Sequence, residues 1–234
     1  MSRFDLKGRT ALVTGGARGC GLSFAEGLAE AGADVAIFDV IDPAPEFFEI
    51  EKKHGVKTAY YKVDVSSKDS LKDGFDKFSK QFNNALDICV PCAGINRHVP
   101  FLEFTYEVHE ELLAVNVTGA YFTAQLAARQ MISNGTKHGS IVFVASIASF
   151  MAIRSQLSSA YCASKGAVRA MVPAIAKELV PYFPHLLESW KDEIMNGRVA
   201  EPDDIRGACI FLASDASSYM TGQDIRVDGG VTMW

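Results

Sequence analysis

Short apolar runs alternate with longer amphipathic segments along the chain. Each apolar run has the length of a buried strand, and each is followed by a stretch with helical periodicity. Parallel strands need long crossover connections, which helices supply, so this alternation predicts an α/β fold with a doubly wound parallel sheet. Strands are expected at residues 10–13, 35–38, 59–63, 88–91 and 140–144, and helices at residues 19–31, 44–53, 67–82, 106–133 and 160–179.

The alternation continues towards the last residues. A further helix is expected at residues 202–212, where Pro-Asp-Asp suits a helix N-terminus, and a last strand at residues 224–227. No repeat, low-complexity tract or linker rich in Pro, Gly or Ser interrupts the 234 residues. A single domain over residues 1–234 is therefore predicted.

Composition argues against several classes of protein. The chain carries a formal net charge of −5, with a pI near 5.6 and no cluster of Lys and Arg, which argues against a nucleic-acid partner. The first residues, MSRFDLKGR, include no apolar stretch typical of a secretory signal, and the longest apolar-leaning run, residues 139–153, is too short to span a bilayer. A cytoplasmic protein without a membrane partner is expected.

The cysteines do not form a recognisable framework. Five are present, an odd number without the spacing of a disulfide-rich domain. Cys89 and Cys92 formally make a Cys-x-x-Cys pair, but this pair closes an apolar run, and no second pair completes a zinc site. Reduced, buried thiols are the preferred interpretation, and no metal site is predicted.

A glycine-rich loop follows the first expected strand. In TGGARGCG, Gly15, Gly19 and Gly21 permit a tight turn, a close approach of the backbone to a pyrophosphate, and packing of the next helix on the sheet. Asp39 ends the second expected strand, where a carboxylate accepts hydrogen bonds from an adenosine ribose. The sequence thus predicts a Rossmann-type dinucleotide site, the alternative being an ordinary turn followed by a capping aspartate.

A tyrosine and a lysine stand four residues apart at the start of a later expected helix. In YCASK, Tyr161 and Lys165 lie on one side of that helix. Such a pair either performs chemistry or shares a solvated helix face, and the spacing alone leaves both interpretations open.

Taken together, these motifs resemble the short-chain dehydrogenase/reductase family. The glycine spacing G-x-x-x-G-x-G is similar to that of the family, and VDV at residues 63–65, AVNVTGAYF, GSIVFVAS and YCASK follow in the family's order. The stretch GRVAEPDDIRGACIFLASDASSYMTGQDIRVDGG is similar to the family's C-terminal segment. The resemblance runs from about residue 6 to the end, with one gap, and implies a Rossmann-type fold and oxidoreductase activity.

The resemblance implies four catalytic residues. Tyr161 would exchange a proton with the substrate oxygen, and Lys165, whose ammonium favours a phenolate, would also bind the nicotinamide ribose. Ser146 would hold the substrate oxygen, and Asn116 would connect Lys165 to a chain of water molecules. The alternative is that Ser146 is a small residue at a strand end, that Asn116 is a helix-kink residue, and that Tyr161 and Lys165 share a solvated helix face.

The cofactor is expected to be NAD, with NADP as the second choice. A carboxylate at Asp39 attracts a ribose hydroxyl and repels a 2′-phosphate, whereas Arg18 offers a cation that would pair with such a phosphate. The expected cofactor-binding residues are Gly15, Arg18, Gly19, Gly21, Asp39, Asp64, Val65, Ala93, Gly94, Tyr161 and Lys165, with Asp64 as the residue that resembles the family's adenine contact.

The chain departs from the family pattern in two places. Pro91 and Cys92 stand where the family usually has two asparagines before Ala-Gly, and a proline there removes a donor from the sheet. After Phe183, a sixth strand and its loop, on the order of 15–20 residues, are missing. Either the sequence omits a stretch that the natural protein contains, or the protein itself lacks it.

The substrate region is expected at residues 147–159 and 181–200. The length of the first segment, the presence of Gln156 and the ending VDGGVTMW are similar to those of polyol dehydrogenases and ketose reductases, which implies interconversion of a secondary alcohol and a ketone. Phe150, Met151 and Leu157 suit an NADP(H)-dependent reductase of bulkier apolar ketones instead. The shortening after Phe183 would suit a non-catalytic binding protein. The family also implies a homotetramer or homodimer.

Overall fold

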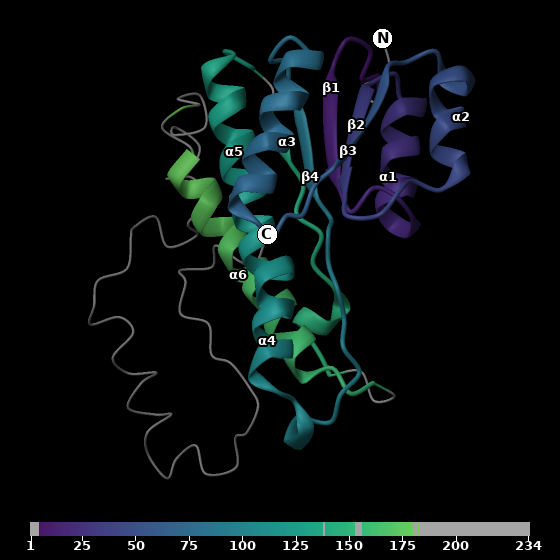
Figure 1. Ribbon diagram of the computed structural model, residues 1–234. Helices are drawn as coiled ribbons and strands as arrows, with labels where there is room; N and C mark the ends of the chain where they lie inside the picture. Colours follow the sequence, from purple (N-terminus) through teal and green to yellow (C-terminus); the bar gives the residue numbers. More distant parts are fainter. Residues whose placement is uncertain (1–4, 138, 153–155, 180–181, 183–234) are drawn as a thin grey trace. The chain divides into compact units, whose positions relative to one another are not determined.

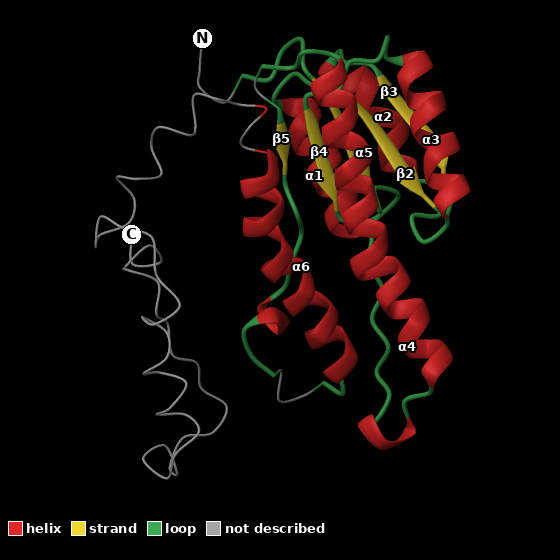
Figure 2. Ribbon diagram, turned by 90° about the vertical axis from the view of Figure 1, so that its left-hand side faces the viewer, coloured by secondary structure: helices red, strands yellow, loops and turns green. Residues whose placement is uncertain are grey.

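A computed structural model describes residues 5–137, 139–152, 156–179 and 182. Its strands form one parallel sheet in the order β3-β2-β1-β4-β5, which is the doubly wound arrangement that the alternation predicts. Figure 1 labels β1 to β4, and Figure 2 labels β5. Residues up to Ala174 form one compact unit, and the sheet and site described below lie within it. The strands are β1 (Thr10–Thr14), β2 (Asp34–Asp39), β3 (Thr58–Lys62), β4 (Ile88–Pro91) and β5 (Ser140–Ile141).

Helices cover both faces of this sheet (Figure 2). One core packs the strands against α1 and α2, and a second packs them against α3 and α5. Side chains of a strand alternate between these cores, so Leu12 lies in one and Val13 in the other, both fully buried. Burial on both faces explains why the strands are nearly continuous apolar runs. The helices are α1 (Gly19–Glu30), α2 (Pro45–His54), α3 (Lys68–Gln81), α4 (Tyr106–Leu113), α5 (Ala120–Ser133) and α6 (Ser159–Leu179).

Local signals set most helix boundaries within a residue or two of the predicted positions. Ser67 caps α3, where its hydroxyl accepts a hydrogen bond from the backbone N–H of Ser70, and Thr105 caps α4 in the same way through Val108. Gly55 ends α2 in the left-handed conformation, with φ of 68°. Two short 3₁₀ turns, Phe101–Glu103 and Ile147–Ser149, were not predicted.

The strand predicted at residues 140–144 ends earlier, at Ile141, and a proline explains the difference. The amides of Ser140 and Val142 donate to the carbonyls of Asp87 and Cys89, both at 2.8 Å, which is the regular ladder between β5 and β4. The next bond of a parallel ladder would come from the amide of Pro91, and proline has none. Pairing therefore stops there.

The helix predicted over residues 106–133 is interrupted by a π-helical turn, Ala114–Gly119, between α4 and α5. A Cβ added to Gly119 would lie 2.7 Å from the Cγ2 atom of Val65, so the glycine allows this turn to pack against the segment that follows β3. Such turns occur frequently at functional sites. This one contains Asn116, whose side chain is buried.

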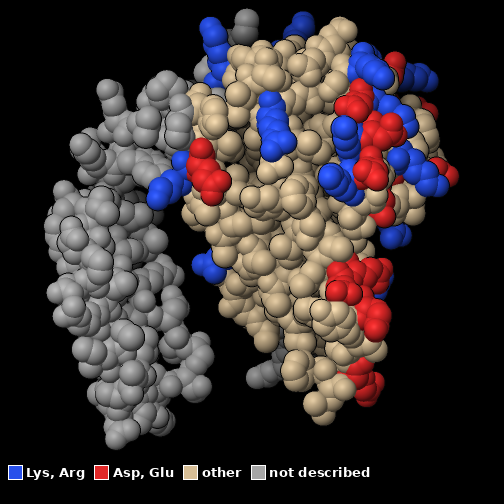
Figure 3. Space-filling view, turned by 60° about the vertical axis from the view of Figure 1, so that its left-hand side comes forward, with Lys and Arg blue, Asp and Glu red and all other residues tan. Residues whose placement is uncertain are grey.

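Charged side chains are unevenly distributed over the described surface. Figure 3 shows a face that is mostly uncharged, with basic and acidic side chains interspersed in one area and acidic side chains gathered in another. Within the described residues, no helix is long and apolar enough to cross a membrane. Several predictions fall outside the described residues. They are the helix at residues 202–212, the strand at residues 224–227, the shortening after Phe183 and, except for Tyr182, the substrate region at residues 181–200.

Candidate active site

The loop between β1 and α1 is shaped by glycines whose side chains would collide with backbone atoms. Gly15 has φ of 68°, and a Cβ there would lie 2.8 Å from the Cα atom of Ala93. Gly19 also has a positive φ, of 57°. A Cβ on Gly21 would lie only 2.0 Å from the carbonyl oxygen of Gly15. The loop makes a tight turn, and the side chain of the N-cap residue Arg18 does not cap the N-terminus of α1. Uncapped backbone N–H groups at a helix N-terminus suit a pyrophosphate.

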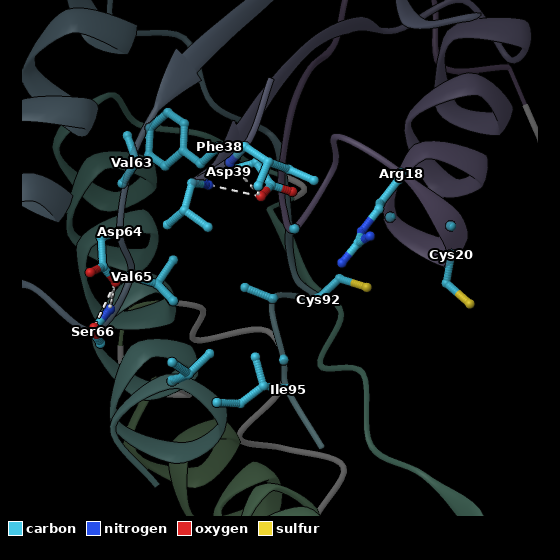
Figure 4. Close-up of a pocket in the computed structure, with 18 of the residues that line it drawn as sticks. Arg18, Cys20, Phe38, Asp39, Val63, Asp64, Val65, Ser66, Cys92 and Ile95 are labelled. Carbon is cyan, nitrogen blue, oxygen red and sulfur yellow. Dashed lines mark hydrogen bonds between the residues drawn. The ribbon is translucent and has the colours of Figure 1, made fainter. Parts of the chain in front are cut away.

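A cavity of about 720 Å³ opens beside this loop, at the carboxyl ends of the parallel strands (Figure 4). This is the edge of a doubly wound sheet where nucleotides bind. The cavity lining includes nine predicted cofactor residues: Gly15, Arg18, Gly19, Gly21, Asp39, Asp64, Val65, Ala93 and Gly94. The residues present therefore fit a dinucleotide, and the contact that each one makes with it stays a prediction.

Backbone amides hold the carboxylate of Asp39 in place at the end of β2. One oxygen accepts from the amide of Ala17 at 3.0 Å, and the other accepts from Val40 at 2.8 Å and Ile41 at 3.3 Å. The carboxylate thus ties the glycine-rich loop to the strand end. Arg18, an exposed residue just before α1, borders the same cavity from the side of that helix (Figure 4).

Thr14, at the end of β1, holds the backbone that follows Pro91, the last residue of β4. Its hydroxyl oxygen accepts hydrogen bonds from the amides of Cys92 and Ala93, both at 3.1 Å. The Ala-Gly backbone therefore still lines the cavity. Burial raises the pKa of the Cys92 thiol, and the ammonium of Lys165 opposes that rise.

Tyr161 and Lys165 lie on one face of α6, as their spacing predicts. The Lys165 Nζ atom is 5.9 Å from the centroid of the Tyr161 ring and donates to the carbonyl of Val144 at 2.8 Å. Lys165 is 5% exposed, so it does not belong to a solvated helix face. Burial lowers its pKa, because the charged form is disfavoured away from water.

Asn116 is held by three hydrogen bonds. Its Oδ1 atom accepts from the amide of Ile95 at 2.8 Å, and its Nδ2 atom donates to the carbonyl of Ile95 at 2.9 Å and to the Ser164 hydroxyl at 3.0 Å. Asn116 and Ser164 are both buried, at 1% and 0% exposure. Sequence analysis did not include Ser164 among the site residues, although it stands directly before Lys165.

Gly94 is the point at which the cavity meets these residues. A Cβ on Gly94 would lie 3.4 Å from the Oδ1 atom of Asn116 and 3.6 Å from the Nζ atom of Lys165. Because Gly94 also lines the cavity, the cavity reaches the vicinity of both side chains. The structure thus brings Asn116, Tyr161 and Lys165 together next to the predicted cofactor site.

Ser146 and Gln156 lie in the segment before α6. Ser146 caps the 3₁₀ turn Ile147–Ser149, where its hydroxyl accepts from the amide of Ala148 at 3.1 Å. Among the contacts of the described residues, this hydroxyl is bonded within its own turn and not to Tyr161 or Lys165. Gln156 is exposed, and residues 153–155 before it lie outside the described part of the chain. The roles of Ser146 and Gln156 stay predictions.

Some cavity residues carry no chemical signal in the sequence. Val40 and Ile41, directly after Asp39, line the cavity and remain 52% and 40% exposed. Arg97 differs from these two, because its charge and its position three residues after Gly94 already suggest the mouth of the cleft; it borders the cavity and forms an ion pair with Glu111 at 2.8 Å. Only the position of Val40 and Ile41, just beyond the carboxyl end of a parallel strand, indicates that they line the cavity.

Comparison with known proteins shows which family this chain is similar to. A family model described as short chain dehydrogenase matches residues 9–183, and one described as enoyl-(acyl carrier protein) reductase matches residues 180–232. A sorbose reductase of Schizosaccharomyces pombe is 32% identical over 251 aligned positions, with 98% of each chain covered. A short-chain type dehydrogenase/reductase from Mycobacterium marinum, a solved structure, is 35% identical with a TM-score of 0.73, and the match covers 99% of both chains. A gluconate 5-dehydrogenase from Burkholderia cenocepacia, solved in complex with NADP and tartrate, is 33% identical with a TM-score of 0.70, covering 99% of this chain and 98% of that one.

These matches also bear on the shortening that the sequence indicates. The alignment with the sorbose reductase spans more positions than the 234 residues of this chain, so that relative carries residues without a counterpart here. The two family models meet at residues 180–183, where the sequence departs from the family pattern. Because one family model spans most of the chain and these relatives cover nearly all of it, the protein belongs to the short-chain dehydrogenase/reductase family and is an NAD(P)-dependent oxidoreductase.

Proposed function

We propose that the protein interconverts a secondary alcohol and a ketone of the sugar-alcohol and ketose class, with NAD(H) as cofactor. The observation that supports this proposal is that the cavity we assign to the nucleotide reaches Asn116 and Lys165 at Gly94, and these two side chains can take part in proton transfer. The family membership makes the protein an oxidoreductase acting on an alcohol or ketone, and this removes support from a role as a non-catalytic binding protein.

The chain's own residues supply the proton chemistry. The nicotinamide, when bound, supplies or accepts the hydride. During reduction, Tyr161 donates its hydroxyl proton to the substrate oxygen, and the ammonium of Lys165 stabilises the phenolate that this leaves. Ser146 orients the substrate oxygen. The Oδ1 atom of Asn116 is a hydrogen-bond acceptor near Lys165. A water molecule held between the two side chains can return a proton to Tyr161 through Lys165.

The carboxylate of Asp39 supports NAD over NADP. Three backbone amides hold the carboxylate at the strand end, so it cannot easily swing away from a 2′-phosphate. The two residues that follow, Val40 and Ile41, are apolar and provide no cation for such a phosphate. NADP is the alternative because Arg18 borders the cavity and because the related gluconate 5-dehydrogenase was solved with NADP.

The substrate class rests on relatives and on the segment before α6. The relatives include a sorbose reductase and a gluconate 5-dehydrogenase, and the exposed Gln156 offers an amide that can hydrogen-bond a substrate hydroxyl. Phe150, Met151 and Leu157 are 72%, 60% and 55% exposed, which supports the alternative of a bulkier apolar ketone. We also propose a cytoplasmic homotetramer or homodimer, whose mass light scattering would measure.

Turnover by the full chain tests the function. NADH or NADPH oxidation would be followed with ketoses, sugar-acid ketones and apolar ketones, and the reverse reaction with polyols. Tyr161→Phe should abolish turnover with little effect on cofactor binding, because it removes only the transferable proton. Tyr106→Phe is a matched control, since Tyr106 is 74% exposed on α4. Wild-type turnover in Tyr161→Phe would contradict the mechanism.

A further inference from the structure

Ser164 is a fully buried hydroxyl that the proposed mechanism does not use. Its Oγ atom donates to the carbonyl of Tyr161 at 2.8 Å, within α6, and accepts from the Nδ2 atom of Asn116 at 3.0 Å. The second bond joins two residues 48 positions apart in the sequence. Ser164 is therefore a direct link between the helix that carries Tyr161 and Lys165 and the π-helical turn that carries Asn116.

The hydrogen-bonding capacity of Asn116 is almost completely used. A primary amide has two N–H donors and two acceptor lone pairs. Both donors are committed, one to the carbonyl of Ile95 and one to Ser164, and one lone pair accepts from the amide of Ile95. The remaining lone pair is on the Oδ1 atom, which lies beside the space that Gly94 leaves open next to Lys165. Towards Lys165, Asn116 can thus act only as an acceptor.

We propose that Ser164 is a positioning residue, which fixes the Asn116 amide so that its free lone pair stays directed towards the surroundings of Lys165. Its hydroxyl proton is used on the Tyr161 carbonyl, so its oxygen presents lone pairs to Asn116. Without that oxygen, a buried N–H of Asn116 has no partner, and an unpaired buried donor is costly enough to shift a side chain. The kinetic consequence rests on the proposed function, whereas the structural link does not.

Kinetics of Ser164→Ala test the consequence for turnover. We expect kcat to fall about tenfold or more while KM for the cofactor stays within about twofold, because the change acts on the proton relay and not on the cavity. Ser133→Ala is the matched control: the Ser133 hydroxyl makes the same type of helical bond, to the carbonyl of Gln130 at 2.9 Å, at the far end of α5. It should leave kcat unchanged.

A double-mutant cycle shows whether Ser164 acts through Asn116. In the Asn116→Ala background, Ser164→Ala should cause no further loss of kcat, because the side chain that it positions is gone. Additive losses would mean that Ser164 acts by another route, and would overturn the proposal.

Hydrogen exchange of the Asn116 side-chain amide tests the link without any turnover. Its NMR signals are identified by their loss in Asn116→Ala. We expect slow exchange in the wild type and exchange about tenfold faster or more in Ser164→Ala, since one donor loses its acceptor. Fast exchange in the wild type, or unchanged exchange in Ser164→Ala, would overturn the proposal, and the wild-type measurement stands even if the variant does not fold.

The two readouts separate this inference from the proposed function. A wild type that turns over none of the alcohols or ketones, but whose Asn116 amide depends on Ser164, would refute the function and support the link. A wild type that is active, with wild-type kcat and wild-type exchange in Ser164→Ala, would support the function and overturn the role of Ser164.

Discussion

Replacing Asp39 by asparagine removes one negative charge from the cofactor cavity and keeps the shape of the side chain. In the wild type, the carboxylate accepts from the amides of Ala17, Val40 and Ile41 at 3.0, 2.8 and 3.3 Å. The asparagine oxygen can still accept from the amides of Val40 and Ile41, but the NH₂ group then faces the amide N–H of Ala17, which loses its acceptor. We therefore expect a loss of about 1–3 kcal/mol in the free energy of unfolding, for one unsatisfied donor.

The effect on cofactor choice follows from the same charge. A ribose hydroxyl bound to a neutral amide loses the charge-assisted part of its hydrogen bond, about 1–1.5 kcal/mol, which weakens NADH binding roughly tenfold. A 2′-phosphate near the wild-type carboxylate is repelled by about 4 kcal/mol per charge pair at 4 Å and an effective dielectric constant of 20, and exposure and salt reduce this to about 1–2 kcal/mol. Asp39→Asn should therefore lower the ratio of the NADPH Kd to the NADH Kd by about two orders of magnitude.

Fluorescence titrations of the full chain with NADH and NADPH measure this ratio. Asp64→Asn is a matched control, because Asp64 is another carboxylate of the cavity lining, bonded to the amide and hydroxyl of Ser66 at 2.9 and 2.6 Å. Asp64 is expected on the adenine side, which both cofactors share, so its substitution should weaken the two equally and leave the ratio unchanged.

Two results would refute the reasoning on Asp39. A wild type that already binds NADPH more tightly than NADH would show that Arg18, and not Asp39, decides the choice of cofactor. An unchanged ratio in Asp39→Asn, in a variant whose urea unfolding shows a folded protein, would show that the carboxylate holds the loop and has no contact with the ribose.

Two further predictions concern the loop and the buried lysine. Gly21→Ala should abolish NADH binding, because the new Cβ would lie 2.0 Å from the carbonyl oxygen of Gly15. Gly27→Ala is the control in the same helix: a Cβ there meets nothing within 4 Å, so this variant should bind NADH normally and gain about 0.5–1 kcal/mol of stability. Equal NADH binding by the two variants would contradict the prediction. Burial lowers the pKa of Lys165 below its ordinary value of 10.5, so the unfolded chain holds the proton more tightly than the folded one. The free energy of unfolding of the wild type, relative to that of Lys165→Met, should therefore rise as pH increases towards 10.5. Urea denaturation at several alkaline pH values measures this difference, and a fall with pH would show that Lys165 is stabilised as a cation.

Most of the fold could be predicted from the sequence because its signals are local. Apolar runs give the strands, and the strand predicted at residues 88–91 matches β4 without change. The strand at residues 140–144 is shorter in the structure because its ladder depends on Pro91 of the neighbouring strand. Periodicity likewise gives one helix over residues 106–133, since a π-helical turn keeps a similar apolar pattern while its hydrogen bonds shift.

The candidate site divides in the same way. The glycine loop, Asp39 and the pair Tyr161 and Lys165 carry spacings that can be recognised along the chain. Ser164 does not, because a serine inside a helix has no pattern that distinguishes a buried partner of Asn116 from a surface residue. The identities of Val40 and Ile41 do not indicate that they line the cavity either, since an apolar residue after a strand is common.

By itself the sequence determined the order of strands and helices, the bare phosphate loop and the residue types available for proton transfer, because each of these depends on residues close together in the chain. Only the tertiary structure decided what surrounds them. It buries Lys165 against the carbonyl of Val144, 21 positions away, and joins Asn116 to Ser164, 48 positions away. It also opens the cavity towards both at Gly94, because a contact between distant residues depends on how the sheet and helices pack.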